Sequence, residues 1–455
     1  NVWNGIYLHY GEKNKIYNND FGICGNVSLK LWGSSYNEIY DNIFNWGLRM
    51  DPGEVHARDS TSSLFEYNSN FNYVARNDFS HGGDGIFIRP LYGAPPMGNY
   101  FEENDTSWAN NNAVESWAPG NVYVRNIANY SSYGFWLGGS DFTYLIDNQV
   151  YYNGGYSTGA KNAPEPFGNA GVSVVNGASS HFLMMGNDVQ YSNGPALAIK
   201  YNNPNNPAYH WLVQNNVLAN NANDPRGYRS YGVYTQYAEW VDIISNMIVN
   251  NGDAQLKEDG STRNISLIGP NNATSNLRKP VANVTVTPAI MSEFADGHMD
   301  KIPQQIKDAE FGIVRIIYVS VKAGEEITFD ASGSTDPQGR DLTYRWELGD
   351  GTVEVGPVVK HTYNTPGVYR AGLTVKNGEL GDLLGFIVTV VPDGEELDGD
   401  AGASAWSLTA NDAVLETYTT HRVAGDKAVK VIANSGQDYK LTYPANKNLS
   451  VNFAD

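Results

Sequence analysis

Disulfides and membrane spans are the first features that the sequence lacks. Cys24 is the single cysteine, so no intrachain disulfide can form, and stability has to come from packing and hydrogen bonds. No apolar run is long enough to cross a bilayer. Basic residues are also scarce, since 30 Lys and Arg face 49 Asp and Glu, which gives a net charge of −19. We therefore expect no membrane span and no nucleic-acid partner, because nucleic acids bind basic surfaces.

Aromatic residues and glycine are abundant instead. The 455 residues include 30 Tyr, 10 Trp and 47 Gly, and only 17% of the residues are charged. This composition is typical of β-structure with many turns, and the length predicts two or three domains. The chain starts inside a repeat at Asn1, so we expect upstream residues, including any signal peptide, to be missing.

One short unit recurs along the first half of the chain. It reads as an aromatic or apolar residue, two variable residues, Asn, a turn, and then a strand that often begins with Gly. The shortest spacing between copies is 22 residues, which predicts a β-solenoid with coils of about 22 residues, and longer spacings predict inserted loops. We expect the recurring Asn side chains to form an internal amide ladder. The nine copies end at Asn19, Asn42, Asn77, Asn104, Asn126, Asn148, Asn187, Asn216 and Asn246.

The strand of each unit alternates between two faces. Its apolar second and fourth positions are expected to point into the coil, and its third and fifth positions to point outward. Stacked strands lie about 4.8 Å apart, so each outward position forms a column of near neighbours. The first column is predicted to be Tyr7, Lys30, Arg49, Phe87, Glu115, Trp136, Ser173, Ala198 and Tyr234. The second is predicted to be His9, Trp32, Asp51, Arg89, Trp117, Gly138, Val175, Lys200 and Gln236.

The pattern changes after this solenoid. Residues 1–269 are predicted to form it, residues 270–311 a connector, and residues 312–392 a domain with longer strands. Five motifs follow one another in that domain: Phe329 to Pro337, Trp346 to Gly351, His361 to Tyr363, Pro366 to Tyr369 and Leu373 to Val375. They resemble a PKD domain, an immunoglobulin-like β-sandwich. The resemblance implies an extracellular spacer or carbohydrate-associated module without catalysis, and we expect Trp346 in its core.

The last residues predict a further module. Residues 393–403 form an acidic linker. Residues 404–455 are similar to the start of a galactose-binding-like carbohydrate module, a β-sandwich that about 50 residues cannot complete. We expect the chain to end inside it, and these C-terminal modules to associate with a cell wall or cell surface.

The solenoid repeats resemble the pectate-lyase-like superfamily, whose members are right-handed parallel β-helices. The resemblance implies an extracellular bacterial protein and action on a polysaccharide as a lyase, a hydrolase or a C5-epimerase. Asp51-Pro52 and Asp84-Gly85 match a pattern of mannuronan C5-epimerases. Leu48, however, stands where that family has its Tyr proton donor, and the family's His is displaced to His56, so we do not expect epimerisation. The predicted class is therefore all-β: a right-handed parallel β-helix, the PKD sandwich and a partial C-terminal sandwich.

The outward face of the coil mixes charges with indoles between Lys30 and Trp136. Such a surface suits a sugar chain, whereas an ordinary solvated sheet would carry only salt bridges between coils. The residues that we expect to bind substrate are Trp32, Arg49, Arg58, His81, Trp117, Trp136 and Lys200.

Our first functional hypothesis is β-elimination on a uronate-containing polysaccharide. A lyase needs a base for the proton at C5 and a cation that stabilises the enolate. Candidate bases are Lys30, His56 and His81, and candidate cations are Arg49, Arg58 and Arg89. A Ca²⁺ ion could assist, with Asp51, Glu54 and Asp84 as its predicted ligands.

Two alternatives stay open. A glycoside hydrolase needs a pair of carboxylates, for which Asp84 and Glu115 on consecutive coils are the best candidates, with Asp51 and Asp141 as alternatives. Glu115 is favoured because an outward carboxylate between two aromatic neighbours has little structural purpose. The third hypothesis is a non-catalytic carbohydrate-binding or adhesin β-helix.

Overall fold

The computed structural model describes residues 2–48, 60–154, 168–175, 179–200, 204–223, 230–260, 263–269 and 271–391, and four short strands beyond them. It divides into two compact units. The first contains residues 1–279, 301–314 and 378–383, and the second contains residues 280–300, 315–377 and 384–455. Among the described residues, no helix combines the length and the apolar character that crossing a membrane requires.

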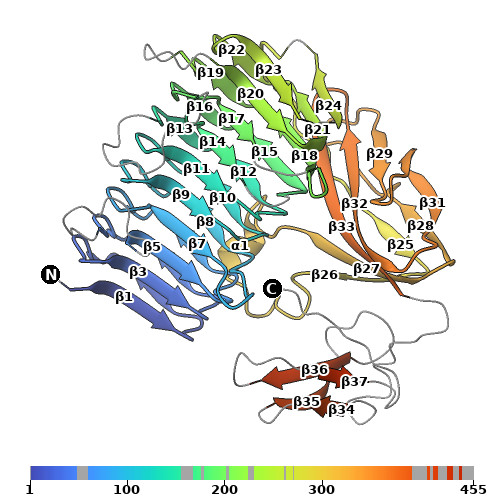
Figure 1. Cartoon of the computed structure of the whole chain (residues 1–455), viewed down its shortest axis with the longest axis horizontal. Coiled ribbons are helices and arrows are strands. Elements are labelled where there is room, and N and C mark those ends of the chain that lie inside the picture. Colours follow the sequence, from blue (N-terminus) through green and yellow to red (C-terminus); the bar gives the residue numbers. More distant parts are fainter. Residues whose placement is uncertain are drawn as a thin grey trace. The chain divides into compact units, whose positions relative to one another are not determined.

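The first unit is a coil of parallel strands (Figure 1). Each coil adds one strand to each of two long sheets, and the later coils add a third. Sheet A contains β1 (Asn4–His9), β3 (Val27–Trp32), β5 (Thr61–Glu66), β7 (Ile86–Arg89), β9 (Asn112–Ser116), β11 (Tyr133–Leu137), β14 (Val172–Val174), β17 (Leu197–Ile199), β20 (Tyr231–Gln236) and β23 (Ala254–Asp259). Sheet B contains β2 (Lys15–Tyr17), β4 (Glu38–Tyr40), β6 (Tyr73–Ala75), β8 (Tyr100–Glu102), β10 (Val122–Val124), β12 (Tyr144–Ile146), β15 (Phe182–Met185), β18 (Ala208–Gln214), β21 (Ala238–Ile244) and β24 (Arg263–Ile268). Sheet C contains β13 (Gln149–Tyr151), β16 (Asp188–Gln190), β19 (Val217–Ala219) and β22 (Met247–Val249).

The recurring Asn forms the predicted ladder inside the coil. Asn104 donates its side-chain amide to Asn126 Oδ1 at 3.0 Å, and Asn126 donates to Asn148 Oδ1 at 3.1 Å. The same contact runs from Asn19 through all nine predicted positions to Asn271. Each amide also bonds backbone groups, so the ladder satisfies polar atoms at a buried corner that water does not reach.

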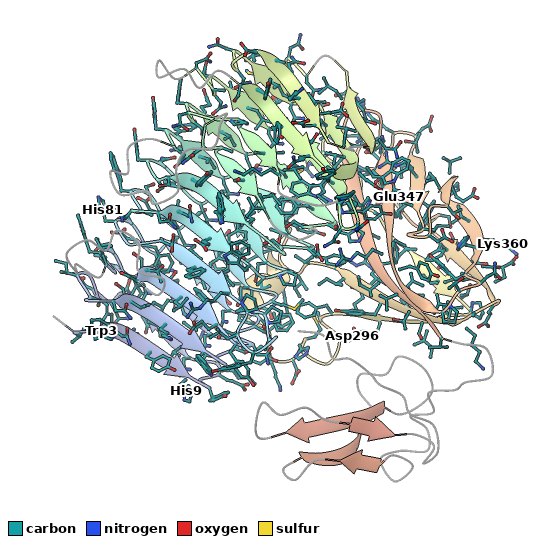
Figure 2. The ribbon with its side chains drawn as sticks, in the orientation of Figure 1. Trp3, His9, His81, Asp296, Glu347 and Lys360 are labelled. Carbon is teal, nitrogen blue, oxygen red and sulfur yellow. The ribbon has the colours of Figure 1, made fainter. Side chains whose placement is uncertain are left out.

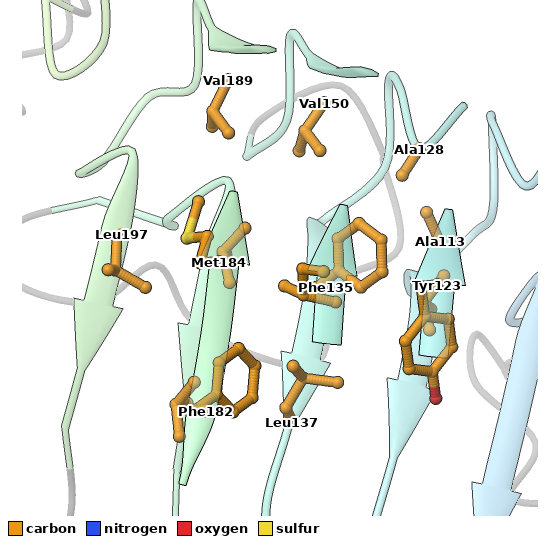
Figure 3. Close-up of a cluster of buried hydrophobic side chains, with 14 of the residues drawn as sticks. Ala113, Tyr123, Ala128, Phe135, Leu137, Val150, Phe182, Met184, Val189 and Leu197 are labelled. Atoms are coloured by element: carbon orange, nitrogen blue, oxygen red, sulfur yellow. The ribbon is translucent and has the colours of Figure 1, made fainter. Parts of the chain in front are cut away.

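Apolar side chains fill the space between the sheets (Figure 3). Phe135 and Leu137 of β11, Phe182 and Met184 of β15 and Leu197 of β17 are all fully buried in one cluster. Aromatic rings stack from coil to coil within it, as between Phe182 and Trp211, whose centroids lie 4.0 Å apart. The core therefore repeats with the coil and holds the outward side chains of sheet A on a rigid base.

The third coil differs from the prediction. We expected Leu48 to Asp51 to supply its sheet A strand, but β5 lies between β3 and β7 instead. The outward positions of this coil are therefore Leu64 and Glu66, in place of the predicted Arg49 and Asp51. The prediction was wrong because residues 48–51 alternate clearly, while β5 is rich in small hydroxyl side chains that hide its periodicity.

The second unit contains a β-sandwich. One sheet contains β25 (Thr285–Thr287), β28 (Glu326–Asp330) and β31 (Val358–Thr362). The other contains β26 (Ile290–Glu293), β27 (Ile316–Lys322), β33 (Gly381–Val391), β32 (Gly367–Lys376), β29 (Thr343–Glu347) and β30 (Val353–Val355). Trp346 is fully buried in the shared core, as predicted. The segment predicted as a connector contributes β25 and β26, and it also holds the helix α1 (Gln304–Asp308).

The last strands form two antiparallel pairs. β34 (Ser407–Thr409) pairs with β37 (Lys440–Thr442), and β35 (Ala413–Tyr418) pairs with β36 (Ala428–Ala433). Together with the coil and the sandwich, these pairs confirm the predicted all-β fold, whose first part is a right-handed parallel β-helix.

Candidate functional site

The outward face of sheet A brings predicted residues from distant coils together. Glu115 of β9 lies in register with Phe87 of β7 on one side and with Trp136 of β11 on the other. Lys30 of β3 belongs to the same column, with Leu64 between it and Phe87. The predicted first column is thus confirmed outside the third coil.

Glu115 is the central carboxylate of this face. Its side chain is 9% exposed, and each oxygen accepts a short hydrogen bond. Trp117 Nε1 donates to Oε1 at 2.7 Å, and Asn112 Nδ2 donates to Oε2 at 2.7 Å. Two neutral donors therefore fix the orientation of the carboxylate, and hydrogen bonds of this kind favour its ionised form.

Asp84 precedes β7, on the coil before that of Glu115, and is fully buried. Its Oδ1 accepts hydrogen bonds from the backbone N–H of Asn112 at 2.9 Å and from Asn111 Nδ2 at 3.0 Å. Asn111 Nδ2 also lies 3.4 Å from Glu115 Oε2, so one amide links the two carboxylates. Burial raises the pKa of Asp84 to about 7, although these two hydrogen bonds act in the opposite direction. Below neutral pH the Asp84 side chain is therefore mainly a neutral acid.

Glu66 of β5 is a central residue that sequence reasoning missed. It is fully buried, and its Oε2 forms an ion pair with Lys30 Nζ at 3.0 Å. Arg89 Nε donates to Oε1 at 2.6 Å. Lys30 and Arg89, predicted as a base and as a catalytic cation of the elimination, are thus both paired with one carboxylate. Glu66 could have been found from its outward position at the end of β5, but only if that strand had been recognised in the sequence.

The remaining predicted substrate-binding residues lie near this face. Trp32 stacks on Tyr67 at a centroid distance of 5.6 Å, and Lys30 Nζ lies 5.9 Å from the Trp32 ring. Lys200 is buried, with its Nζ 5.2 Å from the Trp136 ring. Trp117 is half-buried and contacts Glu115, so the indoles of this face are held by defined partners.

His81 lies elsewhere, at the corner that precedes sheet A. Figure 2 shows it beside the starts of the strands, whereas His9 lies beside the end of β1. His81 Nδ1 is 2.9 Å from Ser80 Oγ, which donates to Asp78 Oδ1 at 2.5 Å. Its ring stacks on neighbours in a column that we call the outer aromatic ladder: Trp46, His81, Trp108, Tyr130, Tyr152 and Tyr191.

Several predicted site residues lie outside the described residues, and their roles stay predictions. This set contains Arg49, Asp51, Glu54, His56 and Arg58. Asp84 is thus the one described member of the predicted Ca²⁺ site. Within the described part of the chain, no three His, Cys, Asp or Glu side chains come together as a metal site. Asp141, an alternative carboxylate, accepts a hydrogen bond from the Ser180 backbone N–H at 2.6 Å.

Comparison with known families identifies the sandwich. Residues 315–381 match the family model of the PKD domain. The predicted resemblance is thereby confirmed for this part of the chain. The PKD domain includes β27 to β32, and its fully buried Trp346 donates a hydrogen bond from Nε1 to Gly356 O at 2.9 Å.

Proteins of known sequence or structure are similar to parts of this chain. A microbial collagenase of Vibrio alginolyticus is 38% identical over 58 residues, which are 13% of this chain and 7% of the collagenase. Tailspike protein 2 of bacteriophage CBA120 is similar in structure, with a TM-score of 0.39 and 9% identity over 84% of this chain and 72% of the tailspike. The A-module of mannuronan C-5 epimerase AlgE6 from Azotobacter vinelandii has a TM-score of 0.35 and 10% identity over 58% of this chain and 59% of that module. The strand pairing itself defines the β-helix.

Proposed function

We propose that this chain belongs to an extracellular polysaccharide-active enzyme, and that its β-helix cleaves glycosidic bonds by hydrolysis with Glu115 as a reacting carboxylate. The observation that supports this proposal is the environment of Glu115. It is an outward, oriented, hydrogen-bonded carboxylate between Phe87 and Trp136, on a face that carries further indoles and charges. An ionised carboxylate in this setting stabilises positive charge at the anomeric carbon, either directly or through an activated water.

Hydrolysis is favoured over elimination by the pairing of the cations. An elimination base needs a free lone pair, but the Lys30 amine is engaged in an ion pair with Glu66. Arg89 is paired with the same carboxylate, so part of its guanidinium group already donates a hydrogen bond within the protein. In hydrolysis water supplies a hydroxyl to the anomeric carbon and a proton to the leaving oxygen, which requires carboxylates rather than a base and a cation.

Asp84 has a positioning role in this proposal. A fully buried side chain does not touch a bound sugar, but Asp84 fixes Asn111 and the Asn112 backbone, and both residues donate to Glu115 from their side chains. The second reacting carboxylate is then one of the predicted alternatives: Asp51 lies outside the described residues, and Asp141 lies in the turn that follows β11, beside Gly120. This assignment changes the predicted Asp84/Glu115 pair from two reacting groups to one reacting and one supporting group.

The test is an activity screen with acidic and neutral polysaccharides. We expect new reducing ends without the ultraviolet absorbance of an unsaturated product. The Glu115→Gln variant should lower the rate at least about 100-fold. Glu103→Gln, an exposed carboxylate paired with Arg125 on another face, is the matched control and should retain wild-type activity.

Three results would contradict the proposal. An unsaturated product would show that the reaction is elimination. Binding of a polysaccharide without any product would identify a non-catalytic carbohydrate-binding protein. Full activity of the Glu115→Gln variant would remove Glu115 from the reaction.

A further inference from the structure

Six aromatic rings gather at the ends of the first sheet A strands, and we call this group the aromatic patch. The rings come from β1 and the turn after it, from the end of β3, and from the turns that follow β5 and β7. Several are strongly exposed: Tyr7 is 48% exposed, Tyr10 60% and Tyr92 83%. The members of the patch are Tyr7, His9, Tyr10, Trp32, Tyr67 and Tyr92.

Most rings of the patch are tilted against one another, and Trp32 and Tyr67, at 27°, are its stacked pair. Tyr92 meets Tyr67 at 77° and Trp32 at 63°, with centroids 6.3 and 6.1 Å apart. Tyr10 meets Tyr67 at 89° and 6.4 Å. Edge contacts of this kind consume little of each ring's face, so faces remain available to a ligand.

The outer aromatic ladder of the same protein provides an internal contrast. Its neighbouring rings lie within 21° of parallel, with centroids 4.3 to 6.3 Å apart. Their faces therefore partly cover one another, although Trp46, Trp108 and Tyr191 remain 46%, 50% and 43% exposed. The ladder is a stacked column along one corner of the coil, whereas most rings of the aromatic patch meet at steep angles.

A polar group lies within the aromatic patch. Lys30 Nζ is 5.6 Å from the Tyr7 ring and 5.9 Å from the Trp32 ring, and its side chain is 21% exposed. Its ion pair with Glu66 holds it in place between the two rings. A sugar ring has an apolar face that stacks on an aromatic ring and hydroxyls that bond to a charged donor beside it, so this combination suits a sugar. An apolar partner would instead desolvate Lys30 without replacing its hydrogen bonds to water.

We propose that the aromatic patch is a distal subsite that holds the non-reacting part of a polysaccharide chain. The patch and Glu115 lie on the same side of sheet A, and β3 is separated from β9 by β5 and β7, which gives three strand spacings or about 14 Å. Leu64 and Phe87 between them are buried, so the sugar chain contacts the two ends of this span and does not stack on the side chains between. A hexose ring spans about one such spacing along a chain, so about three sugar units separate Trp32 from Glu115. This inference rests on the proposed function, because it treats the same chain as substrate.

The consequence is a dependence of binding on chain length. Oligosaccharides too short to reach from Glu115 to the patch bind through the central face alone. Longer oligosaccharides also contact Trp32 and Tyr92, and stacking on those two rings should raise the affinity about 10-fold.

The experiment measures the binding of defined oligosaccharides, from disaccharides to octasaccharides, by isothermal titration calorimetry. The oligosaccharides are prepared from the polysaccharides of the activity screen, and the protein carries Glu115→Gln to prevent turnover. Tyr92→Ala should abolish the gain from disaccharide to octasaccharide and leave disaccharide affinity unchanged, and Trp32→Ala should abolish the same gain. Tyr92 is so exposed that its replacement should not affect folding. Tyr17→Ala, which removes an exposed tyrosine (50%) of sheet B, is the matched control and should keep the gain.

Two results would overturn the subsite. One is a length dependence that survives in both Tyr92→Ala and Trp32→Ala. The other is an equal loss of affinity for disaccharides and octasaccharides, which would indicate general damage to the site. Neither result affects the role of Glu115, because that role is tested by turnover and the subsite is tested by binding.

Discussion

Replacing one amide in the middle of the Asn ladder should destabilise the β-helix far more than replacing one at its start. Asn126 is fully buried, and its Oδ1 accepts from both the backbone N–H and the side chain of Asn104, each at 3.0 Å. Its own amide donates to Asn148 Oδ1 and to Phe101 O. Asn126→Ala therefore leaves a buried N–H without its partner and removes three further hydrogen bonds. At about 1–3 kcal/mol for the orphaned donor and roughly 1 kcal/mol for each of the three other bonds, the loss is about 5 kcal/mol.

The assay is urea unfolding followed by tryptophan fluorescence, with Asn19→Ala as the matched control. Asn19 begins the ladder, and its amide, which donates to Asn42 Oδ1, is partly exposed. Water can replace its bonds, so the same substitution there should cost about 1 kcal/mol. Repeat coils can unfold in steps, so the first transition is the one to compare. If both variants lower the unfolding free energy by the same amount, the buried amides do not act as we reason.

Three further predictions concern the candidate site. Burial raises the pKa of Asp84 in the folded state, so its contribution to stability is full below about pH 4 and is lost as the pH rises through about 7. Relative to the Asp84→Asn variant, the wild-type protein should lose about 4 kcal/mol of unfolding free energy over this window, measured by thermal or urea unfolding. Parallel pH profiles of the two proteins would contradict the raised pKa. Glu66→Gln leaves Lys30 and Arg89 without their shared carboxylate and should lower the unfolding free energy, measured with urea, by about 3 kcal/mol. A change below about 0.5 kcal/mol would mean that these ion pairs do not stabilise the coil. Gly83→Ala places a methyl group 1.9 Å from Ser60 O, so it should lower both the melting temperature and the affinity for polysaccharide. A variant that melts at the wild-type temperature would refute the close approach.

The fold could be predicted from the sequence because its signals repeat. All nine recurring Asn residues occupy the internal ladder, and the apolar positions that alternate around Phe135 and Leu137 point into the core as expected. Because each coil repeats the same pattern, the period could be recognised even where loops are inserted. The sandwich was recognisable for a different reason, since Trp346 and the motifs around it follow one another in a fixed order.

The candidate site was harder to predict, because it depends on single residues rather than on a repeat. Glu115 was placed correctly between its neighbours, since its strand alternates clearly. Glu66 was missed because β5 contains inward-facing Ser63 at a position where other coils have an apolar residue. The complete burial of Asp84 depends on close packing against neighbouring coils, which no local pattern records. The pairing of Lys30 with Glu66 then changed the favoured chemistry from elimination to hydrolysis.

The Asn ladder gives the β-helix an electrical direction. Each side-chain amide in it directs its oxygen toward the preceding coil and donates one N–H to the Asn of the following coil. Aligned amide dipoles add together, as they do along an α-helix, so partial negative charge accumulates at the Asn19 end and partial positive charge at the Asn271 end. The two ends of the coil are therefore unlike poles, and a segment that caps the first coil must offer donors where one that caps the last must offer acceptors.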